Sequence, residues 1–256
     1  MPLYSTACPL PINRKIFRHK VASAFSPTNI TGLSLWLKAD AGVSISGTQV
    51  TGWEDQSSSG YDAQAFDLYP DYIASGLNGK PVISLSEIGT EDNKCLEIIG
   101  GNPMGASGTT AFAVVFVDDV CDNTDNNGPI FGNFGTANTS SHYPYGGDCY
   151  VYDGFASTTR KEELTAPVTI TDSWSLYSVL STTNDWRAYV NGELMHSDSG
   201  NVYSGVPLNS QLFIGASDFG YLLKGKIAES IVYNRVITNV ERQQVETYLN
   251  DKYAIY

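Results

Sequence analysis

The stretch that decides the fold reads Thr-Ala-Phe-Ala-Val-Val-Phe-Val and spans residues 110–117. Successive side chains of a β-strand point to opposite faces of its sheet, so this stretch is apolar on both faces. A strand of this kind must be covered on each side. We therefore expect residues 110–117 to form a central strand of a sheet, with packed layers above and below it.

Two neighbouring patterns extend the sheet along the chain. Asn191-Gly192 separates the alternating segments 186–190 and 193–196, which is the strongest short-range signal of a β-hairpin because both central residues need positive φ. Residues 33–38 alternate Leu with Ser, Trp and Lys, which predicts a half-buried strand. Turn-forming residues separate most of the remaining strand candidates, as in an all-β sandwich. These candidates are residues 80–85, 95–99, 129–134, 148–152, 174–181, 211–215 and 225–234.

One helix is expected, near the C-terminal end of the sequence. Thr238 and Glu241 fit a capping box, in which each side chain hydrogen-bonds to the backbone N–H of the other residue. Val245, Tyr248 and Leu249 follow at positions i, i+3 and i+4, which places them on one apolar stripe. We expect this stripe to pack on the sandwich.

Charge divides the 256 residues into a short basic arm and an acidic body. The formal net charge is −12; residues 1–39 carry +5, and the remainder carries −17 because 10 basic residues face 27 acidic ones. Residues 1–29 contain four prolines and show no sustained period, so we expect an extended N-terminal arm before a single domain of residues 30–256. The acidic body argues against binding to a nucleic-acid backbone. The arm is expected to contact an acidic protein partner through its basic residues, Arg14, Lys15, Arg18 and Lys20.

Targeting signals and cysteine motifs are missing from the sequence. No apolar run reaches the length of about 18 residues that a membrane span needs. Because no apolar stretch of about 7–15 residues follows the first basic residues, we expect no secretory signal. The four cysteines at positions 8, 95, 121 and 149 form no CxxC pair, so neither a zinc site nor a redox motif is expected.

Five motifs in a fixed order resemble the concanavalin A-like lectin/glucanase superfamily, in particular laminin-G-like domains of phage and bacterial surface proteins. The resemblance covers residues from about 30 to 256 and implies a two-sheet antiparallel jelly-roll sandwich. Each motif alone is weak, and the fold that they imply together leaves the ligand open. The motifs are Leu33–Asp40, Val50–Ser57, Leu77–Val82, Tyr189–Gly192 and Gly225–Glu229, the last running into Tyr233–Arg235 and the helix.

The chain departs from the glucanases of this superfamily in its carboxylates. Those enzymes carry a Glu-x-Asp-x-x-Glu pattern, in which alternation puts two carboxylates on one face of a strand. Here the carboxylates come as adjacent pairs, which a strand would point to opposite faces: Glu54-Asp55, Glu91-Asp92, Asp118-Asp119 and Glu162-Glu163. Residues 220–227 nearly spell a phosphate-binding loop, but they lack the final Ser or Thr and lead into a strand. We expect a protein that binds and does not catalyse.

Two segments are candidates for recognition. Residues 133–155 combine Gly, Asn and Ser with aromatic side chains, a composition that suits stacking on sugar rings or protein contacts, although burial in the sandwich explains part of it. The loop 118–127 offers the hard oxygen ligands that calcium prefers, with a solvated acidic loop as the alternative. The candidate ligand-binding residues are Asn133, His142, Tyr143, Tyr145, Asp148 and Tyr152. The candidate calcium ligands are Asp119, Asp122, Asp125 and Asn127.

These observations predict a non-catalytic adhesion or structural protein of a bacteriophage particle, with one lectin-like domain displayed on the tail, a fibre or the capsid. The basic arm would anchor the domain to other virion proteins, and the loops would meet host glycan or a neighbouring subunit, with a homo-oligomer as the expected assembly. Two alternatives stay open. One is a purely structural decoration or tail protein with no ligand, and the other is a polysaccharide-degrading glycosidase.

Overall fold

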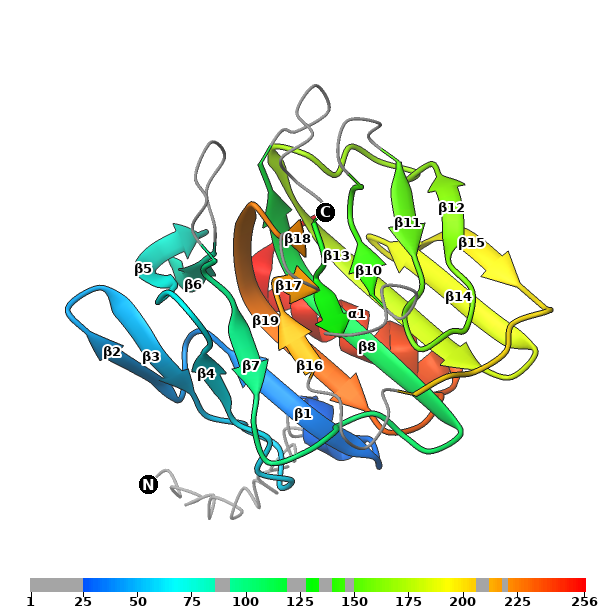
Figure 1. The fold of residues 1–256 in the computed structure, drawn as a ribbon, viewed down its shortest axis with the longest axis horizontal. Coiled ribbons are helices and arrows are strands. Elements are labelled where there is room, and N and C mark those ends of the chain that lie inside the picture. The colour runs from blue at the N-terminus through cyan, green and yellow to red at the C-terminus, as the bar shows by residue number, and fades with distance from the viewer. Residues whose placement is uncertain are drawn as a thin grey trace, which may run out of the picture.

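The computed structural model describes residues 25–85, 93–118, 128–133, 140–145, 150–205, 212–217 and 221–256. Within them, two layers of antiparallel strands face each other, and a single helix covers the outer side of one layer (Figure 1). The helical elements are a short 3-10 helix, η1 (Pro27–Asn29), and α1 (Asn239–Tyr253). The strands are β1 (Leu33–Lys38), β2 (Val43–Ser46), β3 (Gln49–Trp53), β4 (Ala63–Ala65), β5 (Asp71–Leu77), β6 (Lys80–Ser84), β7 (Leu96–Ile98), β8 (Gly108–Val117), β9 (Phe131–Asn133), β10 (Ser141–His142), β11 (Val151–Asp153), β12 (Lys161–Leu164), β13 (Ser173–Thr182), β14 (Asp185–Val190), β15 (Glu193–Asp198), β16 (Leu212–Ile214), β17 (Ala216–Ser217), β18 (Tyr221–Leu222) and β19 (Gly225–Tyr233).

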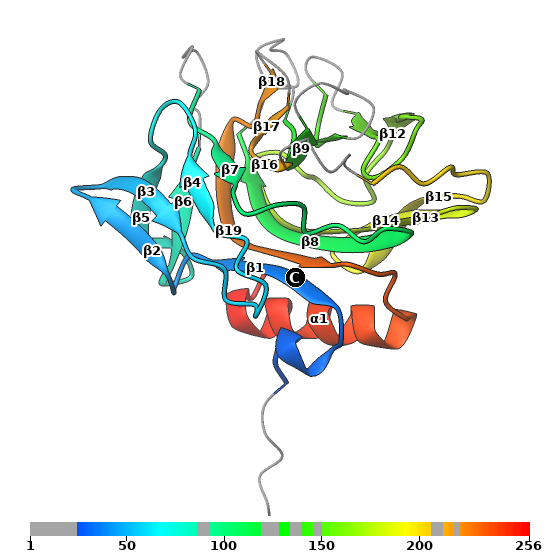
Figure 2. The same ribbon diagram turned by 60° about the horizontal axis from the view of Figure 1, so that its bottom comes forward.

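The largest sheet curls over itself and so supplies strands to both layers. Its order is β15-β14-β13-β8-β19-β6-β5-β3-β4-β7-β16-β9, with β1 paired to β19 and β2 paired to β3. Figure 2 shows the long strands β8, β13 and β19 in one curved layer, with β7, β9 and β16 above it and α1 below it. The small sheets β10-β11-β12 and β17-β18 extend the upper layer. The predicted jelly-roll sandwich with one helix is confirmed.

The central position of β8 is confirmed as well. β8 pairs with β13 on one side and with β19 on the other. Its side chains alternate between two cores. Ala113 and Val115 belong to the core between the two sheets, while Phe112 and Val114 pack with Val245 of α1 on the outer side. The apolar character of both faces therefore follows from the two layers that cover this strand.

β1 differs from the predicted half-buried strand, because both of its faces are covered. Ser34 and Trp36 are buried along with Leu35 and Leu37. The Trp36 indole lies under α1, and its Nε1 donates a hydrogen bond to Glu229 Oε1 at 2.6 Å. The polar appearance of alternate residues in β1 is misleading, since Trp and Ser find hydrogen-bond partners inside the protein.

Local signals in the hairpin and the helix are confirmed in detail. Asn191 and Gly192 have φ of 51° and 80° and connect β14 to β15. At the start of α1, Thr238 Oγ1 accepts the Glu241 N–H at 3.2 Å, and Glu241 Oε2 accepts the Thr238 N–H at 2.7 Å. Val245 and Leu249 are buried against the sheet, which places the helix on the outer face of β8 and β19.

The segment that enters the domain packs against this helix. Ser26 caps η1, and the Tyr233 hydroxyl donates a hydrogen bond to the Pro27 carbonyl at 3.0 Å. The Phe25 ring lies 6.2 Å from the ring of Tyr248 on α1. Residues 25–29 thus contact the body of the domain. Residues 1–24 lie outside the described residues, so the arm with Arg14, Lys15, Arg18 and Lys20 stays a prediction.

Candidate functional site

The small sheet β10-β11-β12 builds the candidate site through strand alternation. Along β11, Val151 and Asp153 point inward and are fully buried, so Tyr152 between them points outward. His142 of β10 is the cross-strand partner of Tyr152, which places both side chains on the same face of the sheet. This face carries a group of aromatic side chains.

Four rings gather on this face, and we call them the aromatic platform: His142, Tyr145, Tyr152 and Tyr221. The ring of Tyr145 lies 4.8 Å from that of Tyr152, at an interplanar angle of 45°. His142 meets Tyr145 and Tyr221 edge-on, with centroids 5.6 Å apart in both pairs. His142 is buried at the base, whereas the three tyrosines are each partly exposed.

The platform combines apolar ring faces with hydroxyl groups. Rings held by edge and tilted contacts present fixed faces on which the C–H groups of a sugar can stack, and tyrosine hydroxyls add hydrogen bonds. The guanidinium of Arg160 lies 5.8 Å from the Tyr145 ring centroid, so a cation borders the platform. This arrangement suits recognition of a polar ring with apolar faces, which is the chemistry of carbohydrate.

The structure brings together three of the predicted ligand residues, His142, Tyr145 and Tyr152. It places Tyr143 elsewhere: this side chain is fully buried, its hydroxyl lies 3.1 Å from Ser175 Oγ, and its ring packs 5.1 Å from Tyr177. Burial raises the pKa of the Tyr143 hydroxyl above its usual range. Tyr143 is therefore a core residue, whose side chain does not reach a ligand at the surface.

Two further predicted residues cannot be placed at the platform. Asn133 closes β9, where its backbone pairs with Leu212, but its side chain lies outside the description. Asp148 lies outside the described residues. The same holds for the four predicted calcium ligands, Asp119, Asp122, Asp125 and Asn127, so the calcium site stays a prediction. Among the residues that the structure describes, no three His, Cys, Asp or Glu side chains gather as a metal site.

Tyr221 of the platform and Arg160 at its border do not stand out in the sequence. Tyr221 opens β18, nearly eighty residues after His142, and Arg160 directly precedes β12. Tyr221 lies within residues 220–227, and the glycines and lysines of this segment resemble a phosphate-binding loop. This pattern does not indicate an aromatic site. The structure shows the second half of this segment as the start of β19.

A buried carboxylate lies behind the platform. Asp153 Oδ1 accepts hydrogen bonds from the Phe155 N–H at 2.8 Å and from Ser141 Oγ at 3.2 Å. Its other oxygen, Oδ2, has no hydrogen-bond partner among the described residues. Burial raises the pKa of Asp153 to about 7, against the opposing effects of these hydrogen bonds and of the charges on Lys161 and Arg160. The charge behind the platform therefore changes near neutral pH.

A second buried group fixes β12 to the opposite layer. Lys161 Nζ donates to Ser157 Oγ and to Asn201 Oδ1, both at 2.8 Å, and lies 3.3 Å from Asp198 Oδ2 of β15. It also lies 5.3 Å from the centroid of the buried Trp186 ring. Burial lowers the pKa of Lys161, although Asp198 and Asp153 oppose this shift. These contacts hold the small sheet in place over β14 and β15.

The most prominent carboxylates of the sequence motifs have structural roles. Asp55, from the Val50–Ser57 motif, accepts the Trp36 N–H and the Ser57 N–H on Oδ1, both at 2.8 Å. Its Oδ2 accepts Ser57 Oγ at 2.6 Å and the Tyr61 N–H at 3.1 Å. The motif thus ties the turn after β3 to β1.

No helix in the described part of the chain has the length and apolar character needed to span a membrane.

Comparison with known proteins agrees with this architecture. Residues 106–241, more than half of the chain, match the family described as Concanavalin A-like lectin/glucanases superfamily. Comparison with curated proteins gives no match. Domain 4 of an extracellular arabinanase from Geobacillus stearothermophilus, solved in complex with arabinotriose, superposes with a TM-score of 0.55 at 14% identity; the match covers 82% of this chain and 95% of that domain.

Two toxin structures are also similar in fold. The binding domain of Paraclostridial Mosquitocidal Protein 1 gives a TM-score of 0.56 at 13% identity, covering 86% of this chain and 53% of that one. The receptor binding domain of a botulinum neurotoxin mosaic serotype C/D gives 0.52 at 13% identity, covering 85% and 51%. The chain thus spans about half the length of these toxin domains. Similarity at such identities shows a shared fold and leaves the ligand of this chain open.

Proposed function

We propose that this chain, which belongs to the concanavalin A-like lectin/glucanase superfamily, is a non-catalytic domain that binds carbohydrate through the aromatic platform. The observation that carries the proposal is the convergence of Tyr145, Tyr152 and Tyr221 around His142 on one partly exposed face. Fixed rings with hydroxyl groups at their edges favour a sugar ring over a purely apolar or a purely ionic ligand.

Two of the buried carboxylates, Asp55 and Glu229, support a binding role over a glycosidase, and a third, Asp153, is fully buried behind the platform. A glycosidase needs two carboxyl groups facing one substrate. Asp55 accepts four hydrogen bonds within the protein, and Glu229 also accepts four, from Trp36, Tyr248, Lys252 and Tyr253. Groups engaged in this way are structural, and the glycosidase is the weaker alternative.

We further propose that the domain is an adhesion or structural component displayed on a bacteriophage particle, on its tail, a fibre or the capsid. The support is the separation of charge along the chain, with a basic arm before an acidic body. Arg14, Lys15, Arg18 and Lys20 would contact an acidic virion subunit, and the platform would face host glycan. A homo-oligomer of such domains would raise the avidity for a repetitive glycan surface.

Glycan binding tests the proposed function directly. A panel of oligosaccharides that includes arabinose oligomers is applied to the full chain, and affinities are measured by calorimetry. Tyr145→Ala and Tyr152→Ala are each expected to weaken binding of a retained sugar about two- to tenfold, since aromatic stacking contributes roughly 0.5–1.5 kcal/mol. Tyr69→Ala is the matched control, because Tyr69 is 45% exposed between β4 and β5.

The outcomes separate the alternatives. Loss of affinity in both platform variants with an unchanged Tyr69 control supports the proposal. Binding that persists in both platform variants contradicts this site. A chain that binds no member of a broad panel favours the purely structural alternative, and release of reducing sugar during incubation favours the glycosidase.

A further inference from the structure

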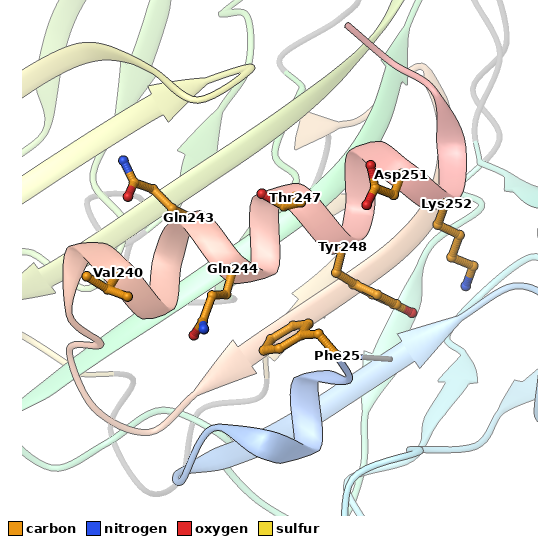
Figure 3. Close-up of a pocket in the computed structure, with 8 residues that line it drawn as sticks. All are labelled: Phe25, Val240, Gln243, Gln244, Thr247, Tyr248, Asp251 and Lys252. Atoms are coloured by element: carbon orange, nitrogen blue, oxygen red, sulfur yellow. The ribbon is translucent and has the colours of Figure 1, made fainter. Parts of the chain in front are cut away.

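The outer face of α1 forms one wall of an open groove, and the residues just before η1 form the other (Figure 3). The groove has a volume of about 600 Å³. Val240, Gln244 and Tyr248 follow one another at intervals of four residues and lie on its helical wall, while Phe25 lies on the opposite wall. This site lies across the main sheet from the aromatic platform and shares no residue with it.

The groove has an apolar floor that no other described element covers. The opposite face of α1 is occupied, because Val245 and Leu249 are buried against the sheet. In the groove, the ring centroids of Phe25 and Tyr248 lie 6.2 Å apart, and the side chain of Val240 is 66% exposed. An exposed valine and two aromatic rings that line the same groove mark a surface that can bind apolar side chains.

The segment that precedes Phe25 in the sequence is attached to the domain at the groove. Phe25 is the first described residue, and it is itself part of the groove wall. Its place is fixed by the capped η1 and by the hydrogen bond from Tyr233 to Pro27. Twenty-four residues precede Phe25, so this segment is covalently joined to the domain at the groove.

The composition and charge of this segment suit the groove. It contains the apolar residues Ile16, Phe17 and Val21 within nine positions of Phe25. It carries four basic residues and no acidic one, and the rest of the chain is strongly acidic. The groove lining holds one exposed carboxylate, Asp251, and one cation, Lys252, whose charge is paired with Asp40 and Glu229. A short tether also keeps the local concentration of the segment in the millimolar range, far above that of a second molecule.

We propose that the groove between Phe25 and α1 binds apolar side chains of the chain's own N-terminal segment, residues 1–24. Ile16, Phe17 and Val21 are the nearest candidates. The basic side chains between them stay in solvent, where they remain available to an acidic partner. The groove thereby sets the position from which the basic arm reaches that partner.

Limited trypsin digestion of the full chain tests this inference, because Arg14, Lys15, Arg18 and Lys20 are cleavage sites beside the apolar residues. Cleavage at these sites is followed by mass spectrometry in the wild type and in Val240→Gln, which removes the exposed apolar contact. Leu194→Gln on β15 is the matched control, since Leu194 is also an exposed apolar residue, at 53%. Thermal melting confirms that each variant is folded.

Docking predicts that Val240→Gln is cleaved about five- to tenfold faster than the wild type and that Leu194→Gln is not. A second variant, Gln244→Lys, is expected to act in the same direction by placing a charge in the groove. Equal cleavage rates in all four proteins would overturn the proposal. Protection that grows with protein concentration would overturn it too, because the occupant would then be the segment of a second molecule.

Discussion

Replacing Asp153 by asparagine should remove a pH dependence from the stability of the fold. Asp153 is fully buried, and burial raises its pKa from 3.8 to about 7. In the unfolded chain the carboxyl group ionises above pH 3.8, whereas in the folded protein it keeps its proton up to about pH 7. The folded state therefore binds more protons in this window, and its stability falls as the pH rises.

The size of the effect follows from the shift. Each pKa unit corresponds to about 1.4 kcal/mol, so the group destabilises the protein by about 4 kcal/mol at pH 8 relative to pH 3.5. The loss begins above the unfolded pKa of 3.8 and is complete above about pH 7. In the Asp153→Asn variant, the amide oxygen would still accept hydrogen bonds from Phe155 and Ser141, but residue 153 would no longer ionise. The variant should therefore lack this contribution.

Urea unfolding at intervals from pH 4 to pH 8 measures the effect. The difference in unfolding free energy between wild type and Asp153→Asn reports the titration of this carboxyl group together with its coupling to Lys161, whose pKa Asp153 raises. The difference should favour the variant increasingly between pH 4 and pH 7 and then level off. Parallel stability profiles for the two proteins would refute the assignment of a raised pKa to Asp153.

Two further predictions concern α1. Glu229→Ala removes the acceptor of four hydrogen bonds, including the 2.7 Å ion pair with Lys252, and should lower the free energy of unfolding by about 3–5 kcal/mol in urea denaturation. The control Glu193→Ala, at an exposed position of β15, should change this free energy by less than about 0.5 kcal/mol. Equal effects of the two variants would contradict the structural role of Glu229. Thr238→Ala removes the helix cap and should cost about 0.5–2 kcal/mol by the same measurement, whereas Thr247→Ala on the exposed face of α1 should cost nothing.

Features that depend on neighbours in the sequence could be predicted. The turn at Asn191-Gly192 and the cap at Thr238 each depend on a few adjacent residues, so their chemistry is visible in the sequence. The continuous apolar run of β8 likewise predicts, without information from other segments, that both faces of this strand are covered. In contrast, β2 and β3 are not predicted: β2 is short and mostly exposed, and in β3 the buried Val50 and Trp53 do not alternate with polar residues at a period of two.

Features that depend on distant residues could not be predicted. β1 looks half-buried because the helix that covers Trp36 comes about two hundred residues later. The aromatic segment 133–155 has no strand period over most of its length, so composition did not separate the buried Tyr143 from the partly exposed Tyr145. Tyr221 joins the platform only through the fold, since β18 lies far along the chain from β10.

The double cover of β8 also has a consequence during synthesis of the protein. Until α1 has emerged from the ribosome, Trp36, Phe112, Val114 and Ile231 form an uncovered apolar surface on an otherwise paired sheet. Such a surface promotes association between nascent chains, and chaperones bind surfaces of this kind. A stop codon before residue 239 would therefore yield an aggregating product, even though most of the strands would be present.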